Sequence, residues 1–495
     1  MGEPVMQFSA LWWLLTVPLL FLVVVLGLIL ASRRRFSPPK KGSIAFFHPF
    51  AECGGGGERV LWAAVHSIQT CHPEADVYIY CSASSTVTDL VHAAKSRFNL
   101  DILPNFSVVP LRKRHFLDPS RYPRLTMVCQ AIASVIVAVE ALDGLVPQVW
   151  IDTTGWAFPY PLIRMLGAHV IAYVHYPTIS SDMLLRVKNR EAAFNNSSSL
   201  ASSGIFSYLK LVYYHIFAFI YGLCGGFANI CMVNSSWTKS HIEDIWWMHG
   251  GTESIALVYP PCDTEDLRKL DLDKRLKTIT VLSIAQFRPE KNHEIQLQAL
   301  AHARNAARHM QDAELAELVM QTKLILAGGC RGDKDYERVD MLKYKAKELG
   351  LDDSCVEFCI NVPFSDLRTM LGNAIAGTHS MRDEHFGISV VEYMAAGAIP
   401  IAHASGGPQT DIVKPEPVDG EMQETGYLCD SVEQYSRALT EVLRMDTHAR
   451  LAMSGAARRR SSRFSDERFQ HDFLEAVMPL LTADGILPTN KSKNI

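Results

Sequence analysis

Short apolar segments alternate with longer, helix-like segments along most of this chain, and glycine or proline often separates the two. The helix-like segments include Leu125–Leu142. Strands that alternate with helices usually pair in parallel, so this order predicts an α/β fold. In the first half of the chain we expect strands at Ser43–Phe47, Asp76–Cys81, Phe106–Pro110, Gln148–Asp152 and Ala168–Val174.

The same order begins again after Val258–Asp263, where two prolines stop any regular element. We therefore expect two Rossmann-like, doubly wound domains facing an inter-domain cleft, which a chain of 495 residues is long enough to form. The expected strands of the second domain are Thr278–Ile284, Thr322–Ala327, Cys355–Ile360 and Ala398–Ala402. The predicted boundaries are 1–41 for an N-terminal membrane anchor with a basic flank, 42–257 for the first domain, 258–455 for the second, and 456–495 for C-terminal helices and a tail.

An uncharged apolar run of 20 residues, Leu11–Leu30, matches the thickness of a bilayer core, about 30 Å. A cleaved signal peptide is the alternative, but it usually has a basic start and a shorter apolar region. Here Glu3 precedes the run and Arg33–Arg35 follows it. The positive-inside rule then places the rest of the chain in the cytosol, behind a retained anchor.

A second apolar segment, Gly204–Met232, is interrupted by Gly222 and by Gly225-Gly226. If it crossed the membrane, the two domains of one enzyme would lie on opposite sides. We therefore expect a helix that lies in the membrane interface or is buried under the first domain.

Charge and cysteine content exclude some classes of function. The net charge of −4 gives no electrostatic reason to expect nucleic-acid binding. Eleven scattered cysteines, without CxxC pairs, favour reduced thiols facing the cytosol. No cysteine and histidine cluster has metal-ligand spacing, so we expect no metal.

The segment His379–Pro408 carries the clearest site pattern. Glu384 lies in a loop, a helix begins near Ile388, Gly397 caps its end, and Glu392 lies about one turn inside it. The start of a helix attracts phosphate, while carboxylates accept hydrogen bonds from sugar hydroxyls. Two glutamates at this spacing are usually solvated charges. Their place at a helix start nevertheless favours a nucleotide-sugar site, with the donor-binding residues Phe386, Gly387 and Ile388.

Two further segments follow predicted strands. Arg288 and Lys291 come after the first strand of the second domain, where cations can bind a diphosphate and stabilise a departing nucleotide. A glycine loop follows the first strand of the chain, and its glycines permit a close approach to a ligand. It is neither a dinucleotide fingerprint nor a P-loop. The loop residues are Gly54, Gly55, Gly56 and Gly57, and we expect a helix to begin near Val60.

The chain resembles the retaining GT-B glycosyltransferases of family 4. Their signature of two glutamates separated by seven residues matches Glu384 to Glu392 and continues to Gly406-Gly407. The resemblance covers most of the chain after the anchor, and it implies that the helices of 456–495 cross back to the first domain. It implies that Glu384 contacts the transferred sugar and that Glu392 contacts the nucleoside ribose.

The resemblance extends to other positions. His175 follows a predicted strand and is similar to the family's histidine near the transferred sugar, although a lone histidine is usually structural. The glycine loop would face the cleft, near the donor diphosphate and the acceptor. Lys291 matches the family lysine, but Gln286 occupies the place of the family arginine. Arg288 can replace that arginine only if the loop is reshaped.

The anchor, the glycine loop and the segments around His175 and Lys291 together resemble the GDP-mannose-dependent α1,2-mannosyltransferases of the dolichol pathway. This implies transfer of the fourth and fifth mannoses to a dolichyl-diphosphate-linked oligosaccharide at the cytosolic face of the endoplasmic reticulum membrane. Glu384, His175 and Lys291 would be the catalytic residues. The reaction would retain configuration without a metal or another cofactor, and other mannosyltransferases of the pathway would be partners.

Three alternatives remain open at this point. One is a glycan-binding membrane protein, which should lack nucleotide affinity. Another family 4 transferase would use a UDP-sugar and a different lipid acceptor. A catalytically idle relative would act as a scaffold for other enzymes of the pathway, although intact Glu384, Glu392 and Lys291 argue against it.

Overall fold

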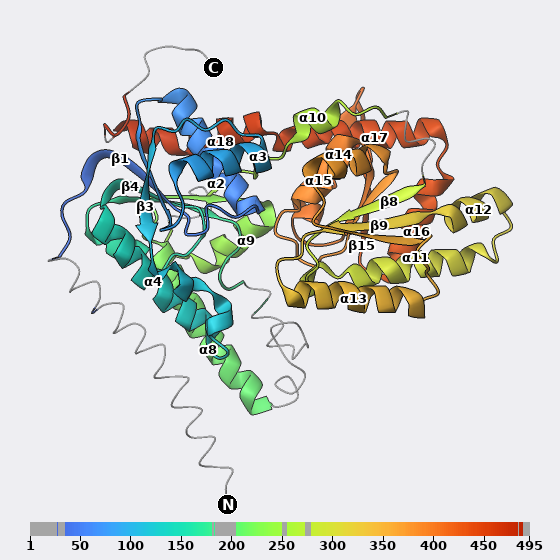
Figure 1. Cartoon of the computed structure of the whole chain (residues 1–495), viewed down its shortest axis with the longest axis horizontal. Helices are drawn as coiled ribbons and strands as arrows, with labels where there is room; N and C mark the ends of the chain where they lie inside the picture. Colours follow the sequence, from blue (N-terminus) through green and yellow to red (C-terminus); the bar gives the residue numbers. More distant parts are fainter. Residues whose placement is uncertain are drawn as a thin grey trace, which may run out of the picture. The chain divides into compact units, whose positions relative to one another are not determined.

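The computed structural model describes residues 27, 35–180, 183, 204–249, 255–272, 279–483 and 485–488, with the side chains of the helix at Gly204 described from Lys210 onward. Apart from Gly27, the predicted anchor at Leu11–Leu30 lies outside the described residues. The chain divides into two compact units (Figure 1). The first contains the described residues of Met1–Asn234, Thr238–Tyr259 and Gln470–Ile495, and the second contains those of Ser235–Trp237 and Pro260–Phe469.

The first unit is built on a parallel sheet with the strand order β3-β2-β1-β4-β5-β6-β7. From β1 the chain adds strands toward one edge of the sheet, and from β4 it adds them toward the other edge. This switch between β1 and β4 is the doubly wound topology. The strands are β1 (Lys40–Phe47), β2 (Asp76–Ser82), β3 (Phe106–Leu111), β4 (Pro147–Asp152), β5 (His169–Val174), β6 (Ile230–Val233) and β7 (Ile255–Leu257). The helices and helical turns are α2 (Gly56–Cys71), α3 (Val87–Phe98), η1 (Lys113–Leu117), η2 (Pro119–Arg121), α4 (Thr126–Gly144), α5 (Tyr160–Met165), α8 (Gly204–Gly225) and α9 (Ser236–Ile245).

Alternation along β1 explains why this sheet needs helices on both faces. Ala45 and Phe47 belong to the core cluster shared with α4 and α8, whereas Ile44 and Phe46 are equally buried but point the other way. The strand is therefore apolar on both sides, as expected for a central strand of a parallel sheet. The predicted strands of the first half correspond to β1 to β5.

The apolar segment Gly204–Met232 forms α8 and most of β6. Tyr213, Phe217 and Tyr221 are buried in the core of the first unit, so the part of α8 whose side chains are described is a core helix with one exposed face. α4 is the one helix in the described part of the chain that is long and apolar enough to cross a membrane, with a mean hydropathy of 1.6. Half of that helix is buried, as is typical of a core helix.

The second unit repeats the same topology, with the strand order β10-β9-β8-β11-β12-β15 and parallel pairing throughout. The order in which strands are added to the sheet reverses between β8 and β11. The strands are β8 (Thr280–Ile284), β9 (Lys323–Gly328), β10 (Val356–Ile360), β11 (Ala376–His379), β12 (Ile399–His403) and β15 (Tyr427–Cys429), beside a hairpin of β13 (Glu416–Val418) and β14 (Glu421–Gln423).

Helices cover both faces of the second sheet (Figure 1). α10 (Thr264–Arg268), α14 (Phe364–Asn373), α15 (Ile388–Ala396) and α17 (Thr447–Ser461) share one face. The other face carries α11 (His293–Ala307), α12 (Ala313–Gln321), α13 (Asp333–Glu348) and α16 (Val432–Arg444). The helical turns are η5 (Pro289–Lys291), η6 (Pro408–Ile412) and η7 (Ser462–Phe464), and α18 (Asp466–Ala483) begins in the second unit and ends in the first.

The predicted strands of the second half correspond to β8, β9, β10 and β12, while β11 and β15 were missed. β11 reads Ala-Gly-Thr-His, which lacks the branched apolar residues that signal a strand. Gly377 is required there, because a Cβ would lie 2.1 Å from the ring of Tyr393. β15 has only three residues. All eleven cysteines are free thiols, as predicted.

One sequence prediction near the first strand was wrong. We expected a loop through Gly57 and a helix beginning near Val60, but α2 begins at Gly56. The reason is a cap formed by Glu58: its Oε2 accepts a hydrogen bond from the N–H of Gly55 at 2.7 Å. Gly56 and Gly57 therefore belong to the first helical turn, with their N–H groups at the helix start.

Candidate active site

Three side chains meet where the second sheet reverses direction. Glu384 lies in the loop after β11, and its Oε2 is 2.5 Å from Nζ of Lys291 and 3.0 Å from Nε2 of His379. Lys291 follows β8, and His379 is the last residue of β11. Ligands of doubly wound sheets bind at this reversal, beyond the carboxyl ends of the strands. Lys291 and Glu384, which were predicted as site residues from two separate segments of the sequence, are therefore in contact at this reversal.

The surroundings of Glu384 keep its carboxyl group ionised. Burial alone would raise its pKa, but the ammonium of Lys291 and the hydrogen bond from His379 outweigh burial and hold the pKa well below its ordinary value. The side chain of Glu384 is 13 % exposed and that of Lys291 is 22 % exposed. An ionised, partly accessible carboxylate can accept hydrogen bonds from sugar hydroxyls.

Lys291 is held in place through its backbone. It ends the turn η5, and Asn292 then adopts a left-handed conformation, with φ of 49°, before α11 begins. The Oγ of Ser380 lies 2.9 Å from the carbonyl oxygen of Lys291 and 3.0 Å from that of Asn292. Nε2 of Gln296 donates to the same Oγ at 2.7 Å. These contacts fix the lysine loop to the end of β11.

Arg288 lies at the start of the same turn and is half-buried. Among the described residues, the ion-pair partners of Glu384 are Lys291 and His379, and Arg288 is not one of them. Among the described residues, Lys291 and not Arg288 thus forms the ion pair with Glu384. The role of Arg288 at a diphosphate stays a prediction.

The predicted helix start at Ile388 is confirmed. Gly387 precedes α15 with φ of 108°, and no side chain caps the helix. A helix start without a side-chain cap presents backbone N–H groups and a positive dipole end to a ligand. Gly397 ends the helix with φ of 83°, as the sequence predicted. Phe386 is buried against Phe464, so it supports the loop from within the core.

Gly406 and Gly407 let the loop after β12 pack directly against the loop that carries Glu384. The N–H of Gly407 donates to the carbonyl oxygen of Glu384 at 2.8 Å. A Cβ at Gly406 would lie 2.1 Å from that same oxygen, and one at Gly407 would lie 2.4 Å from the carbonyl oxygen of Phe386. Both positions therefore require glycine.

Glu392 lies in the second turn of α15 and is half-buried. Its neighbour Tyr393 is fully buried and fixes the helix to the sheet, because its hydroxyl accepts a hydrogen bond from the N–H of Ile284 at 2.6 Å. Glu384 and Glu392 thus flank the start of one rigid helix. The binding role of each remains a prediction.

The first unit gathers a second set of polar residues at the reversal point of its own sheet. His48 follows β1, and its Nδ1 lies 2.8 Å from Oγ1 of Thr153, which follows β4. A Cβ at Gly57 would lie 3.6 Å from Nε2 of His175 and 3.7 Å from Cε1 of His48. His175, which follows β5, therefore lies beside Gly57. His48 was not identified as a site residue from the sequence, although it directly follows β1, the strand that precedes the glycine loop.

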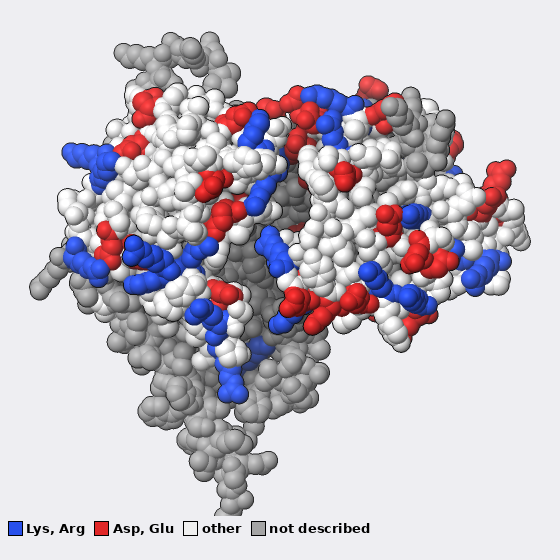
Figure 2. Space-filling model, in the orientation of Figure 1, with Lys and Arg blue, Asp and Glu red and all other residues white. Residues whose placement is uncertain are grey.

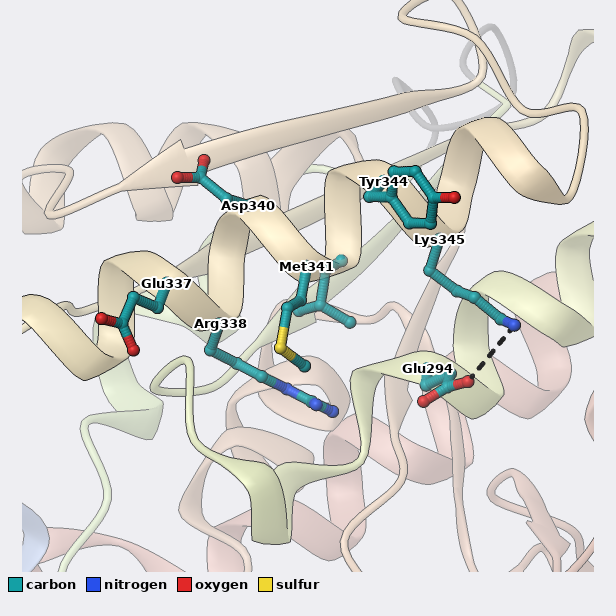
Figure 3. A pocket seen from close by; sticks show the side chains of 8 residues that line it. Glu294, Glu337, Arg338, Asp340, Met341, Tyr344 and Lys345 are labelled. Atoms are coloured by element: carbon teal, nitrogen blue, oxygen red, sulfur yellow. Dashed lines mark ion pairs between the residues drawn. The ribbon is translucent and has the colours of Figure 1, made fainter.

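Two surface features stand apart from these residues. A hollow of about 530 Å³ lies between α13 and the start of α11, lined by Glu294, Arg338, Met341, Tyr344, Lys345 and neighbours (Figure 3). Glu294 and Lys345 pair across it at 3.8 Å. Lys, Arg, Asp and Glu are intermixed on the visible face of the molecule (Figure 2).

In the part of the chain that the structure describes, metal ligands do not gather at the strand ends. Within the described ranges, the one group with metal-ligand spacing is His471, Asp472 and Glu475 on α18, and two of the three are exposed. The predicted absence of a metal and of other cofactors stays a prediction.

Sequence comparison matches both halves of the chain to known families. Residues 41–246 match "ALG11 mannosyltransferase N-terminus", and residues 265–460 match "Glycosyl transferases group 1". A Xenopus laevis protein named GDP-Man:Man(3)GlcNAc(2)-PP-Dol alpha-1,2-mannosyltransferase is 43 % identical over 445 residues, which cover 89 % of this chain and 88 % of that protein. The Homo sapiens protein of the same name is 42 % identical over 472 residues, 93 % of each chain.

Solved structures resemble the fold at low sequence identity. A sucrose-phosphate synthase from Thermosynechococcus elongatus superposes with a TM-score of 0.62 at 16 % identity, covering 89 % of this chain and 99 % of that one. Anabaena Alr3699/HepE in complex with UDP-glucose gives 0.56 at 15 % identity, covering 88 % and 99 %. These likenesses concern the fold alone.

Proposed function

The chain belongs to the family of GDP-Man:Man(3)GlcNAc(2)-PP-Dol alpha-1,2-mannosyltransferases, and from that premise we propose how its residues carry out the transfer. The chain is a glycosyltransferase with two Rossmann-like domains of the GT-B type. It transfers mannose in α1,2 linkage from GDP-mannose to the dolichol-linked trimannosyl oligosaccharide. We further propose two successive additions, which give the fourth and fifth mannoses.

The contact of Lys291 and His379 with Glu384 is the observation that carries the assignment of the site. It supports a role for Glu384 as the acceptor of a hydrogen bond from the transferred mannose. Lys291 and the N–H groups at the start of α15 stabilise the charge that develops on the diphosphate. Glu392 accepts from the ribose hydroxyls, and Arg288 adds positive charge if its side chain reaches the phosphates.

The first unit supplies the remaining residues of the proposal. His175 contacts the transferred mannose, and the N–H groups at Gly55–Gly57 lie near the donor diphosphate and the acceptor. The proximity of Gly57 to His175 at one sheet edge supports this assignment. His48 shares that edge, where it contacts Thr153.

The reaction retains configuration on the donor's front face. The bond between C1 of mannose and the β-phosphate oxygen breaks, while a bond forms between C1 and the 2-hydroxyl oxygen of the acceptor mannose. The acceptor's proton passes to the departing phosphate oxygen, so the products are GDP and the extended lipid-linked oligosaccharide. No enzymatic nucleophile is needed, and the positive charges named above take the place of a metal.

A dolichol-linked acceptor resides in a membrane, and this fits an enzyme that is membrane-associated. We propose that Leu11–Leu30 is a single-pass anchor in the endoplasmic reticulum, with both domains in the cytosol. Association with other mannosyltransferases of the pathway belongs to the same proposal. Protease added to intact microsomes should digest both domains, and protection of either domain would contradict this orientation.

A donor screen tests the proposed reaction. The purified protein is incubated with the trimannosyl lipid and either GDP-mannose, UDP-glucose or UDP-N-acetylglucosamine, and the product is digested with an α1,2-specific mannosidase. We expect transfer from GDP-mannose alone and complete release of the added sugar by the mannosidase. Transfer from a UDP-sugar would support a different transferase. Binding to pathway enzymes without transfer from any donor would support a scaffold.

A further inference from the structure

We propose that His379 is a positioning residue for mannosyl transfer, which holds the carboxylate of Glu384 while Lys291 directs its charge toward the donor diphosphate. This inference rests on the proposed function, because it concerns the same site. His379 is outside both the glutamate signature and the cationic loop, and its strand carried no recognisable sequence pattern.

Both donors to Glu384 reach the same carboxylate oxygen. Nε2 of His379 lies 3.0 Å from Oε2, and Nζ of Lys291 lies 2.5 Å from it. Among the described residues, no donor bonds Oε1. One oxygen is thus held by the protein, and the other is available to a sugar hydroxyl.

The two donors differ in rigidity. His379 ends a strand, its side chain is 3 % exposed, and its carbonyl oxygen accepts a hydrogen bond from the hydroxyl of Tyr435 at 2.8 Å. Lys291 has a four-carbon stem on a short turn and is more exposed. A lysine ammonium has three rotatable donors, so it can turn toward a phosphate. The imidazole keeps its place when that happens.

The protonation of the His379 ring fits this role. Its Nδ1 is buried and has no hydrogen-bond partner among the described residues. A proton on Nδ1 would be an unsatisfied buried donor, so the neutral ring carries its proton on Nε2. That proton points at Oε2 of Glu384, which makes the histidine the donor and the carboxylate the acceptor.

The backbone of the lysine loop has a separate attachment. Ser380, not His379, holds the carbonyl groups of Lys291 and Asn292. Tyr435 binds the backbone of residue 379, so this bond survives a change of the side chain. Substitutions at His379 therefore test the hold on Glu384 without removing the attachment of Lys291.

The ionisation of Glu384 gives a readout that a purely structural role would not change. Burial, Lys291, His379 and His385 are the influences on its carboxyl group, and together they lower its pKa. Loss of the His379 donor raises that pKa, and the acid limb of the pH–rate profile moves to higher pH. Lys291 and His385 remain and keep part of the effect.

Three variants of the full-length enzyme separate the hydrogen bond from the shape of the side chain. His379→Gln can place an amide N–H near the position of Nε2, whereas His379→Asn is too short to reach it and His379→Leu has no donor. We expect the Leu and Asn variants to lose about 10- to 100-fold in kcat for GDP-mannose, with less than about threefold change in the Kd of GDP. His379→Gln should recover most of the loss and restore the acid limb.

Equal kcat and unchanged acid limbs in all three variants and the wild type would overturn the proposal. So would equal losses in all three, because the shape of the ring would then be what matters. If the His379→Leu or His379→Asn variant fails to bind GDP, the comparison of His379→Gln with the wild type still tests the proposal. A loss of more than about tenfold in the kcat of His379→Gln would contradict rescue by a hydrogen-bond donor. If the wild type transfers no mannose, the proposed function fails. The effect of the His379 hydrogen bond on Glu384 is then measured as the pKa of the ¹³C-labelled carboxyl group of Glu384. That pKa must be higher in His379→Leu than in the wild type.

Discussion

Nζ of Lys291 lies 2.5 Å from Oε2 of Glu384, although the two residues are 93 positions apart in the chain. The contact joins the segment after β8 to the segment after β11, the two strands between which the second sheet reverses. It places a cation and an anion beside the start of α15. A nucleotide-sugar needs both, because its diphosphate is negative and its sugar carries hydroxyl groups.

Replacing Lys291 tests the cationic part of this site. We predict that Lys291→Met lowers kcat for GDP-mannose by about 100- to 1000-fold, because charge on the leaving diphosphate loses its main side-chain partner. The readout is the initial rate of transfer to the trimannosyl lipid. Lys323→Met is a matched control, since Lys323 pairs with Glu357 at 2.6 Å in the same unit but on more exposed side chains. Comparable losses in both variants would contradict a specific role for Lys291.

The lowered pKa of Glu384 predicts a pH-dependent contribution to stability. A carboxyl group whose folded-state pKa is lowered adds stability above its unfolded pKa, and that stability is lost as the pH falls through the folded value. We therefore expect Glu384→Gln to lower Tm near neutral pH. The difference in Tm from the wild type should shrink as the pH falls from about 4.5, the ordinary glutamate value, toward the lower folded-state pKa of Glu384. Thermal unfolding at several pH values measures this.

A surface glutamate supplies the control for that series. Glu421 is exposed on β14, so Glu421→Gln should change Tm little at any pH. If the difference in Tm between Glu384→Gln and the wild type stays constant down to about pH 2, the pKa of Glu384 is not the cause of that difference.

The close packing of the two loops predicts that Gly406 cannot be replaced. Gly406→Ala would put a Cβ 2.1 Å from the carbonyl oxygen of Glu384, on a backbone with φ of 59°. Backbone strain costs about 1–2 kcal/mol, and the overlap about 1–3 kcal/mol more. Gly420→Ala is the control for strain alone, since its φ is 88° and no atom lies within 4 Å of the added Cβ. Chemical unfolding should show a larger loss of unfolding free energy for Gly406→Ala than for Gly420→Ala. Equal losses would mean that the overlap is relieved at no cost.

Chelation tests the expectation that no metal takes part. Because Lys291 and the start of α15 already supply positive charge, we expect transfer to proceed at an unchanged rate after treatment with EDTA and gel filtration. Mg²⁺ and Mn²⁺ are then added back to the treated enzyme. Loss of activity that either ion restores would show that a metal is required.

The parts of the fold that the sequence predicted depend on local patterns. α15 carries a mostly apolar segment between Gly387 and Gly397, and β1 and β8 carry short apolar segments. The rule that strand ends meet at one edge of a sheet places the segments of Lys291 and Glu384 near each other, but it did not predict their contact. β11 could not be predicted, because its small residues are fixed by packing against Tyr393. His379 was missed for the same reason.

Other features depend on contacts between distant segments. No local pattern indicates that Ser380 holds the backbone of Lys291, or that Tyr435 holds that of His379. The start of α2 was misplaced because four successive glycines usually indicate a loop, and the cap by Glu58 outweighs that tendency. Sequence reasoning thus identified the groups that carry charge and missed those that position them.

Comparison of the wild-type enzyme with Glu384→Gln tests the central claim most directly. Both are incubated with radiolabelled GDP-mannose and the trimannosyl lipid, and GDP binding is measured on the same preparations. We predict that the wild type adds two α1,2-linked mannoses, while Glu384→Gln binds GDP normally and transfers at a rate reduced by at least about 100-fold. Wild-type turnover by Glu384→Gln would contradict the assignment of this site.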